Sequence, residues 1–231
     1  MTTYKNSTRF DGYHNIHKAL RAVMTDTLFA VGRMDATDDC EVTRVVQQCR
    51  TLIGLCRMHL EKEERFIHPA MEARAPGSSA ASAADHEHHA QQIEHVARDV
   101  NDLEAAEGDA RHAAGALLYR SLGRFVGENF VHMNDEETKN NAILWRWYTD
   151  AELLAIESAL VNSISPEAKG AAMPWLIKGL NPGERAEFLA TVRGTVPEQV
   201  FAGMLASIKT LLSDLDWRKL SHELSRVAVA A

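Results

Sequence analysis

Apolar residues recur every three or four positions along most of this chain, which is the spacing of one face of an α-helix. No segment alternates apolar and polar residues for long enough to indicate a β-strand. Turn-forming residues divide the pattern, and its four longest segments are predicted to be helices over residues 11–34, 40–73, 85–107 and 110–148. Short connections favour antiparallel neighbours, so we expect an all-α protein built on an up-and-down antiparallel four-helix bundle.

Two features mark the third helix and the chain beyond the bundle. The segment 75–84 is rich in small residues and is predicted to be a mobile loop, with Asp85 capping the third helix. After the bundle, Thr149 with Glu152, and Asn181 with Glu184, have the spacing of capping boxes.

The tail is predicted to form three or four short helices, over residues 149–163, 181–194, 197–212 and 215–229. The chain would then divide into a bundle domain, residues 1–150, and a helical C-terminal extension, residues 151–231. The extension is expected to serve as a packing element, as the contact surface of a possible homodimer, or as a cover over one end of the bundle.

A histidine followed four residues later by a glutamate occurs in two of the predicted helices. His59 with Glu63 and His132 with Glu136 form these pairs. Four residues are just over one helical turn, so each pair lies on one helix face, about 6 Å apart along the axis. Imidazole and carboxylate suit iron, manganese or zinc, and a carboxylate can bridge two cations. Two such pairs facing each other are therefore a candidate site for two metal ions.

On a helical wheel of about 100° per residue, both pairs fall within the apolar stripe of their helix. An ionised glutamate in a bundle core is costly unless something compensates its charge. A metal ion would do so, and the alternatives are a buried His–Glu hydrogen bond or a solvated surface pair. The stripe around His59 contains Val45, Leu52, Leu55, Cys56, Phe66 and Ala70, and the stripe around His132 contains Leu118, Leu122, Phe125, Ile143 and Trp147.

The other two helices also carry histidines on their apolar faces. His17 lies near the centre of the first stripe, whereas His14 lies nearer its edge. In the third helix, His86 and His89 share the apolar face, while His88 and His95 lie roughly opposite and are expected to be solvated. A single inward histidine is usually a hydrogen-bonded core residue, but here every helix of the bundle supplies one.

This arrangement resembles the hemerythrin-like family, also called the HHE cation-binding domain, over roughly residues 10–150. The resemblance implies a non-haem diiron centre with two iron ions as cofactor, although manganese or zinc also suits such ligands. It is carried by the first-helix phrase 13–20 (YHNIHKAL), the run 59–69 (HLEKEERFIHP), Asp85-His86, and the phrase 132–137 (HMNDEE).

The resemblance implies that His17, His59, His86 and His132 are terminal iron ligands and that Glu63 and Glu136 bridge the irons. The chain departs from the oxygen-carrying hemerythrins in two places. Its third helix offers histidines three apart rather than four, and its fourth helix has a glutamate four residues after its histidine rather than an aspartate five residues after it. His89 is a further candidate ligand, His14 an alternative on the first helix, and Glu128 a ligand or a supporting partner.

Composition narrows the classes of protein to be considered. The net charge is −7 and no basic cluster stands out, which argues against nucleic-acid binding. No stretch approaches about 18 uninterrupted apolar residues, and the first ten residues lack a signal-peptide core, so we expect a cytoplasmic protein without membrane contact. The three cysteines, Cys40, Cys49 and Cys56, are expected to be reduced core thiols.

The functions open to such a site differ in what happens to its small ligand. Our main hypothesis is a protein that binds or senses dioxygen, nitric oxide or iron, because the set is rich in histidine and has only two bridging carboxylates. The alternative is a diiron oxidase, oxygenase or peroxidase acting on a small organic substrate, for which the C-terminal helices would provide a cover. A third possibility is an interaction protein with a purely structural metal.

Overall fold

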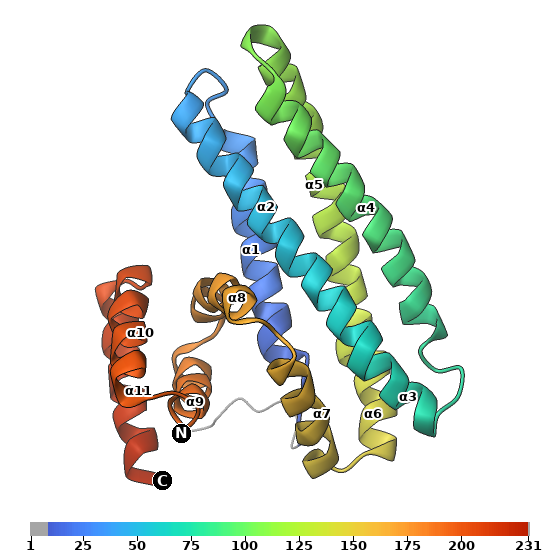
Figure 1. Ribbon diagram of the computed structural model, residues 1–231, viewed down its shortest axis with the longest axis vertical. Helices are drawn as coiled ribbons and strands as arrows, with labels where there is room; N and C mark the ends of the chain where they lie inside the picture. Colours follow the sequence, from blue (N-terminus) through green and yellow to red (C-terminus); the bar gives the residue numbers. More distant parts are fainter. Residues whose placement is uncertain (1–8, 231) are drawn as a thin grey trace.

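The protein is described here by a computed structural model of residues 9–230, in which every regular element is a helix. Four long helices run antiparallel to one another in an elongated bundle (Figure 1). The predicted all-α, up-and-down four-helix fold with extra C-terminal helices is thus confirmed, while residues 1–8 of the predicted first domain lie outside the described part. The bundle helices are α1 (His14–Arg33), α2 (Asp39–Lys62), α4 (Ala80–Ala105) and α5 (Gly108–Asp135).

The second and fourth bundle helices each contain one π-helical turn, which was not predicted. Helix α2 passes through η1 (Glu63–Ile67) into α3 (His68–Arg74), and α5 passes through η2 (Glu136–Asn140) into α6 (Asn141–Trp147). A π turn holds an extra residue and so rotates everything beyond it relative to a regular helix. The placement of Trp147 on the inward stripe was therefore wrong: it is 47% exposed, and Leu144 is buried instead.

The third bundle helix begins five residues earlier than predicted. Only residues 75–79 form a turn, and the alanine-rich stretch from Ala80 is already helical, in keeping with the high helix propensity of alanine. The side chain of Glu72 holds this turn by accepting hydrogen bonds from the backbone amides of Gly77 (2.7 Å) and Ser79 (2.9 Å). The prediction of a mobile loop reaching Asp85 was wrong, because an anchored turn takes its place.

Two clusters of buried apolar side chains pack the helices of the bundle together. The main core fills the bundle above the His–Glu pairs, and a smaller cluster closes its lower end. Cys49 and Cys56 lie in the main core as predicted, but Cys40 is exposed, so its assignment as a core thiol was wrong. Fully buried residues of the main core include Val23, Val45, Leu52, Val100, Leu103, Leu118 and Leu122. The lower cluster is formed by Tyr13, Met71, Leu144 and Leu153.

Five helices follow the bundle, one more than the prediction allowed. The capping boxes at Thr149 and Asn181 are both present. The unexpected helix is α8, which Ser165 caps by accepting from the amide of Ala168 at 3.2 Å and which continues through Pro174. These helices are α7 (Asp150–Asn162), α8 (Pro166–Gly179), α9 (Pro182–Arg193), α10 (Glu198–Leu211) and α11 (Asp214–Ala230).

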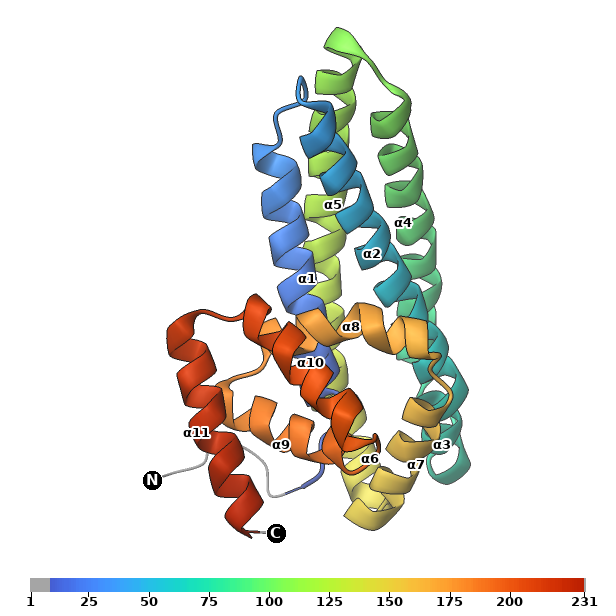
Figure 2. The ribbon, with the colours of Figure 1, turned by 60° about the vertical axis from the view of Figure 1, so that its left-hand side comes forward.

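Helix α8 joins the C-terminal helices to the bundle (Figure 2). Its Ala172 and Trp175 belong to the main core, whereas α9, α10 and α11 surround a separate apolar cluster. Gly179 lies so close to α1 that an added Cβ would be 2.6 Å from the carbonyl oxygen of Lys18, so the contact depends on glycine at this position. No helix in residues 9–230 is long and apolar enough to cross a membrane.

Candidate metal centre

Six of the predicted ligands converge inside the bundle from its four long helices. They are His17 on α1, His59 on α2, His86 on α4, His132 on α5, and Glu63 and Glu136, the first residues of η1 and η2. None of the six is more than 9% exposed. The site therefore brings together, inside an otherwise apolar bundle, residues up to 119 positions apart in the sequence, from His17 to Glu136.

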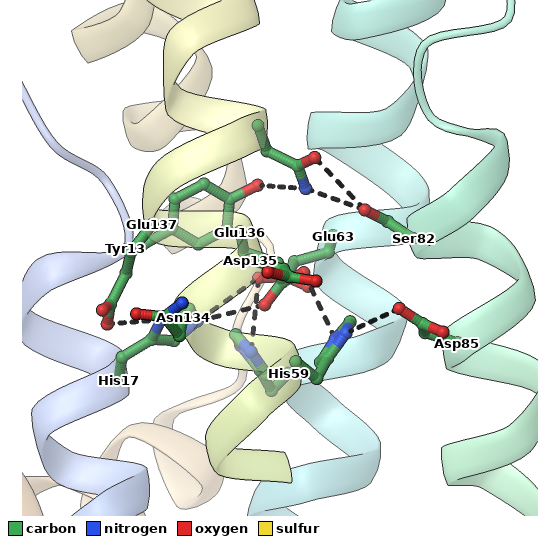
Figure 3. A network of polar contacts seen from close by, with 12 residues as sticks. Tyr13, His17, His59, Glu63, Ser82, Asp85, Asn134, Asp135, Glu136 and Glu137 are labelled. Atoms are coloured by element: carbon green, nitrogen blue, oxygen red, sulfur yellow. Dashed lines mark hydrogen bonds and ion pairs between the residues drawn. The ribbon is translucent and has the colours of Figure 1, made fainter. Parts of the chain in front are cut away.

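The two glutamates lie between two pairs of histidines. One oxygen of Glu63 lies 3.2 Å from His59 Nε2 and 3.9 Å from His17 Nε2, and its other oxygen lies 3.2 Å from His86 Nε2. Glu136 likewise has one oxygen 3.4 Å from His17 Nε2 and the other 3.4 Å from His132 Nε2. Figure 3 shows both carboxylates beside the rings of His17 and His59.

These contacts divide the site into two overlapping groups of four residues, in each of which all ligand atoms lie within 4.8 Å of one another. Each group has two imidazoles and the same two carboxylates. A carboxylate with one oxygen towards each of two cations is a bridging ligand. The groups are His17, His59, Glu63 and Glu136, and Glu63, His86, His132 and Glu136.

Most of the polar atoms that face the centre lack a hydrogen-bond partner. The Nε2 atoms of all four histidines, Glu63 Oε2 and both oxygens of Glu136 are inaccessible to solvent and make no hydrogen bond within residues 9–230. A buried polar atom without a partner costs about 1–3 kcal/mol, and an isolated charge costs more. Seven such atoms pointing at one place fit a site that binds metal, because cations would satisfy all of them together.

The charges of the site are coupled, because its carboxylates and histidines shift one another's pKa values. Burial opposes protonation of the buried His17 and His86, but the neighbouring carboxylates raise the pKa of each to about 10. Burial likewise opposes ionisation of Glu63, yet its contacts with His17 and His86 hold its pKa below the ordinary value. In the opposite direction, burial lowers the pKa of His59 well below its ordinary value. Without a metal, the paired carboxylates thus retain protons on two histidines as their counter-charge.

Outer carboxylates contact the far nitrogen of three of these histidines. Glu137 lies 3.0 Å from His17 Nδ1 and is itself held by Arg21, Glu64 lies 3.3 Å from His86 Nδ1, and Asp85 lies 3.6 Å from His132 Nδ1. Carboxylates in this position fix the tautomer and orientation of a metal-bound imidazole. The rings are thereby oriented with Nε2 towards the centre.

The structure does not bring the other predicted ligands into either group. His89 is buried, but its Nδ1 accepts a hydrogen bond from Asn129 (3.3 Å) and its ring lies against that of His132, with 4.7 Å between centroids. His14 lies at the surface, 2.9 Å from Glu184. Glu128 is likewise occupied outside the site, by Arg124 at 2.7 Å and by His88 at 2.9 Å.

Two further buried polar side chains lie near the site, and one of them, His68, was not predicted. His68 is 7% exposed and its ring lies 4.7 Å from that of His86, and Tyr13 is 4% exposed and lies 5.0 Å from the ring of His17. In a regular helix, five residues place His68 about 140° away from Glu63, off the inward face. The π turn η1 removes that offset, so only knowledge of the turn would have revealed the position.

The sequence model of the hemerythrin HHE cation-binding domain matches residues 8–143, more than half of the chain. The chain belongs to this hemerythrin family. No curated protein and no solved structure is significantly similar to it. As a hemerythrin-family protein with a buried His–Glu cluster, it has the features of a metal-binding protein.

Proposed function

We propose that this hemerythrin-family protein is a non-haem diiron protein that binds or senses dioxygen, nitric oxide or iron. The observation that carries the proposal is that Glu63 and Glu136 belong to both groups of four candidate ligands. Two carboxylates shared between two pairs of imidazoles are the ligand set of a bridged metal pair. We propose that the six residues of these two groups are the metal ligands. His89, which lies outside both groups, stays a further candidate.

Iron is the metal that we propose, with manganese or zinc as alternatives. Each group supplies two nitrogen and two oxygen atoms, which suits all three metals. Iron prefers more than four ligands, so such a set leaves coordination positions open to an external ligand. When bound, an iron pair would supply reversible redox chemistry and affinity for small diatomic molecules, as expected for a family that binds ligands such as oxygen.

The burial of the six ligands, none more than 9% exposed, favours a small ligand over an organic substrate. A pocket of about 360 Å³ lies between α1 and α8 and contains none of the six ligands. A second pocket of about 340 Å³, between α2 and α4, contains none of them either. Organic ligands of drug size usually occupy sites of about 300–1,000 Å³. A diatomic molecule needs no such volume beside the metals.

A second candidate function is a diiron oxidase, oxygenase or peroxidase. The observation that favours it is the closed lower end of the bundle, where Leu153 of α7 packs with Tyr13 and Leu144. A bare carrier needs no such cover, whereas an oxidase benefits from excluding water. In that case residues 151–231 would cover a metal-binding unit formed by residues 1–150.

We propose that the protein is cytoplasmic. The free thiols of Cys49 and Cys56 suit that reducing compartment.

Absorption spectroscopy on the reduced, iron-loaded protein would separate these functions. A binder is expected to give a visible band on exposure to oxygen that persists and disappears on removal of the gas. An enzyme would show a transient band with net consumption of oxygen or peroxide. A spectrum that does not respond to oxygen, peroxide or nitric oxide would refute both and leave a structural metal.

A further inference from the structure

A layer of four buried polar side chains lies one helical turn below the metal ligands. Each is four or five residues from a ligand, and the antiparallel helices displace all four towards the same end of the bundle. None is more than 8% exposed. The members of this polar layer are Tyr13, four before His17; His68, five after Glu63; Ser82, four before His86; and Asn140, four after Glu136.

Three members of the polar layer are joined by hydrogen bonds that leave one donor unused. The amide of Asn140 donates to the Tyr13 hydroxyl (3.3 Å) and to the Ser82 hydroxyl (3.0 Å), and Ser82 lies 3.2 Å from the amide oxygen. Tyr13 therefore accepts a hydrogen bond, but its own proton has no acceptor within residues 9–230.

The fourth member, His68, has no hydrogen bond at all within the described residues. Its Nε2 is inaccessible to solvent and unpartnered, and its ring lies 4.7 Å from that of His86. An imidazole nitrogen can donate a hydrogen bond, and Nε2 of His68 has no acceptor among the described residues. An unpartnered buried imidazole destabilises a fold, and its position beside a metal site points to a ligand that it meets only in the loaded protein.

The polar layer lies between the metal ligands and the apolar cluster at the end of the bundle. Figure 3 shows Tyr13 and Ser82 on the opposite side of the Glu63 and Glu136 carboxylates from the His59 ring. Below the layer, Met71, Leu144 and Leu153 close the end of the bundle. The donors of Tyr13 and His68 are thus held in a buried, preorganised position, where hydrogen bonds to a charged group are strong.

We propose that Tyr13 and His68 form the ligand-facing wall of the metal site and donate hydrogen bonds to a small anionic ligand there. This inference rests on the diiron function proposed above and names the residues that select its ligand. The preferred ligand carries negative charge on the atom that points away from the metals, as azide does. The opposite face of the site lies towards the main core, where Leu20, Cys56 and His89 stand three residues along from His17, His59 and His86, and Asn129 already donates to His89.

Azide binding to the iron-loaded protein, followed by its visible absorption, tests this wall. Tyr13→Phe and His68→Leu should each keep the iron content of the wild type while weakening azide binding roughly tenfold to a hundredfold, the loss expected for one hydrogen bond to a charged group. His68→Gln, which retains an N–H donor, should recover most of the affinity. Two matched controls remove comparable groups away from the site. Tyr148→Phe removes a hydroxyl that donates to the carbonyl of Ala70, and His95→Leu removes an imidazole at the surface.

Several results would overturn the proposal. Wild-type azide affinity in both Tyr13→Phe and His68→Leu would do so, as would a loss found only in Asn129→Leu, because the ligand would then lie on the opposite face. Loss of iron in His68→Leu would make His68 a metal ligand rather than a donor. A wild-type protein that holds iron but binds no azide would refute the small-ligand function itself, and the wall with it.

The metal-free protein provides an independent readout. If His68 has no structural partner, His68→Leu should raise the melting temperature of the metal-free protein by roughly 2–4 °C, since a buried unpaired polar group is removed. A fall in melting temperature would show that the imidazole stabilises the fold by packing on His86, and would contradict its assignment to ligand binding.

Discussion

Replacing single ligands should change the number of bound metals in a pattern set by the two overlapping groups. His17 and His59 belong to one group only, and His86 and His132 to the other, whereas Glu63 and Glu136 belong to both. His59→Ala should therefore impair one metal position and leave the second group complete. Glu63→Ala should reduce both groups from four ligands to three.

The size of the effect follows from this count. Loss of even an outer partner of a metal ligand typically weakens metal binding 10–100-fold, or about 1.4–2.8 kcal/mol, so loss of a direct ligand should cost at least that much. With two irons in the wild type, we expect about one in His59→Ala or His132→Ala. Fewer than one should remain in Glu63→Ala or Glu136→Ala, because both positions are weakened at once.

Metal content per folded chain can be measured by mass spectrometry after gel filtration, with circular dichroism to confirm folding. The controls are Glu61→Ala, His88→Ala and His95→Ala, three exposed positions that should retain the wild-type content. The reasoning would be refuted if the controls lost as much metal as the glutamate variants, or if His59→Ala and Glu63→Ala lost the same amount.

Three further predictions concern protons and the C-terminal helices. Loading metal at pH 7.5 should release about two protons per chain, from His17 and His86, because their pKa values are raised to about 10. Calorimetry in buffers of different ionisation enthalpy would detect the release, and its absence would contradict the charges assigned to these histidines. Burial raises the pKa of Glu157 from 4.5 to about 7, so the fold loses stability as pH rises through this range. Glu157→Gln should then stabilise the protein at pH 8 by about 1–2 kcal/mol and have little effect at pH 4. The pKa difference sets an upper limit of about 3 kcal/mol, and the expected gain is smaller because the side chain is half-buried. Equal shifts in melting temperature at both pH values would exclude this origin. Deleting residues 165–231 should lower the melting temperature or change the oligomeric state in gel filtration, because α8 contributes Ala172 and Trp175 to the main core; an equally stable monomer would show that these helices are dispensable.

The fold and the inward set of histidines were predictable because both depend on a period that the sequence displays. Apolar residues repeat at helical spacing over long segments, and His17, His59, His86 and His132 fall on the resulting stripes. The repeated His–Glu spacing then placed two carboxylates in the core. All of these inferences need only a straight α-helix as reference.

What the sequence did not reveal depends on local departures from that reference. The π turns at Glu63 and Glu136 hid His68 and misplaced Trp147, because each turn shifts the inward face of the residues that follow. The start of α4 was missed because its small residues resemble a loop until Glu72 is seen to hold the turn before it. Helix α8 was missed because Pro174 and two glycines argue against a helix that tertiary packing nevertheless stabilises.

The central claim is that the six converging residues hold two iron ions per chain. The most direct test is metal analysis by mass spectrometry on full-length protein purified without added metal. We predict about two irons per chain and little else. Recovery of one tightly bound zinc and no iron, or of a single iron that does not increase on anaerobic loading with excess ferrous iron, would contradict the account.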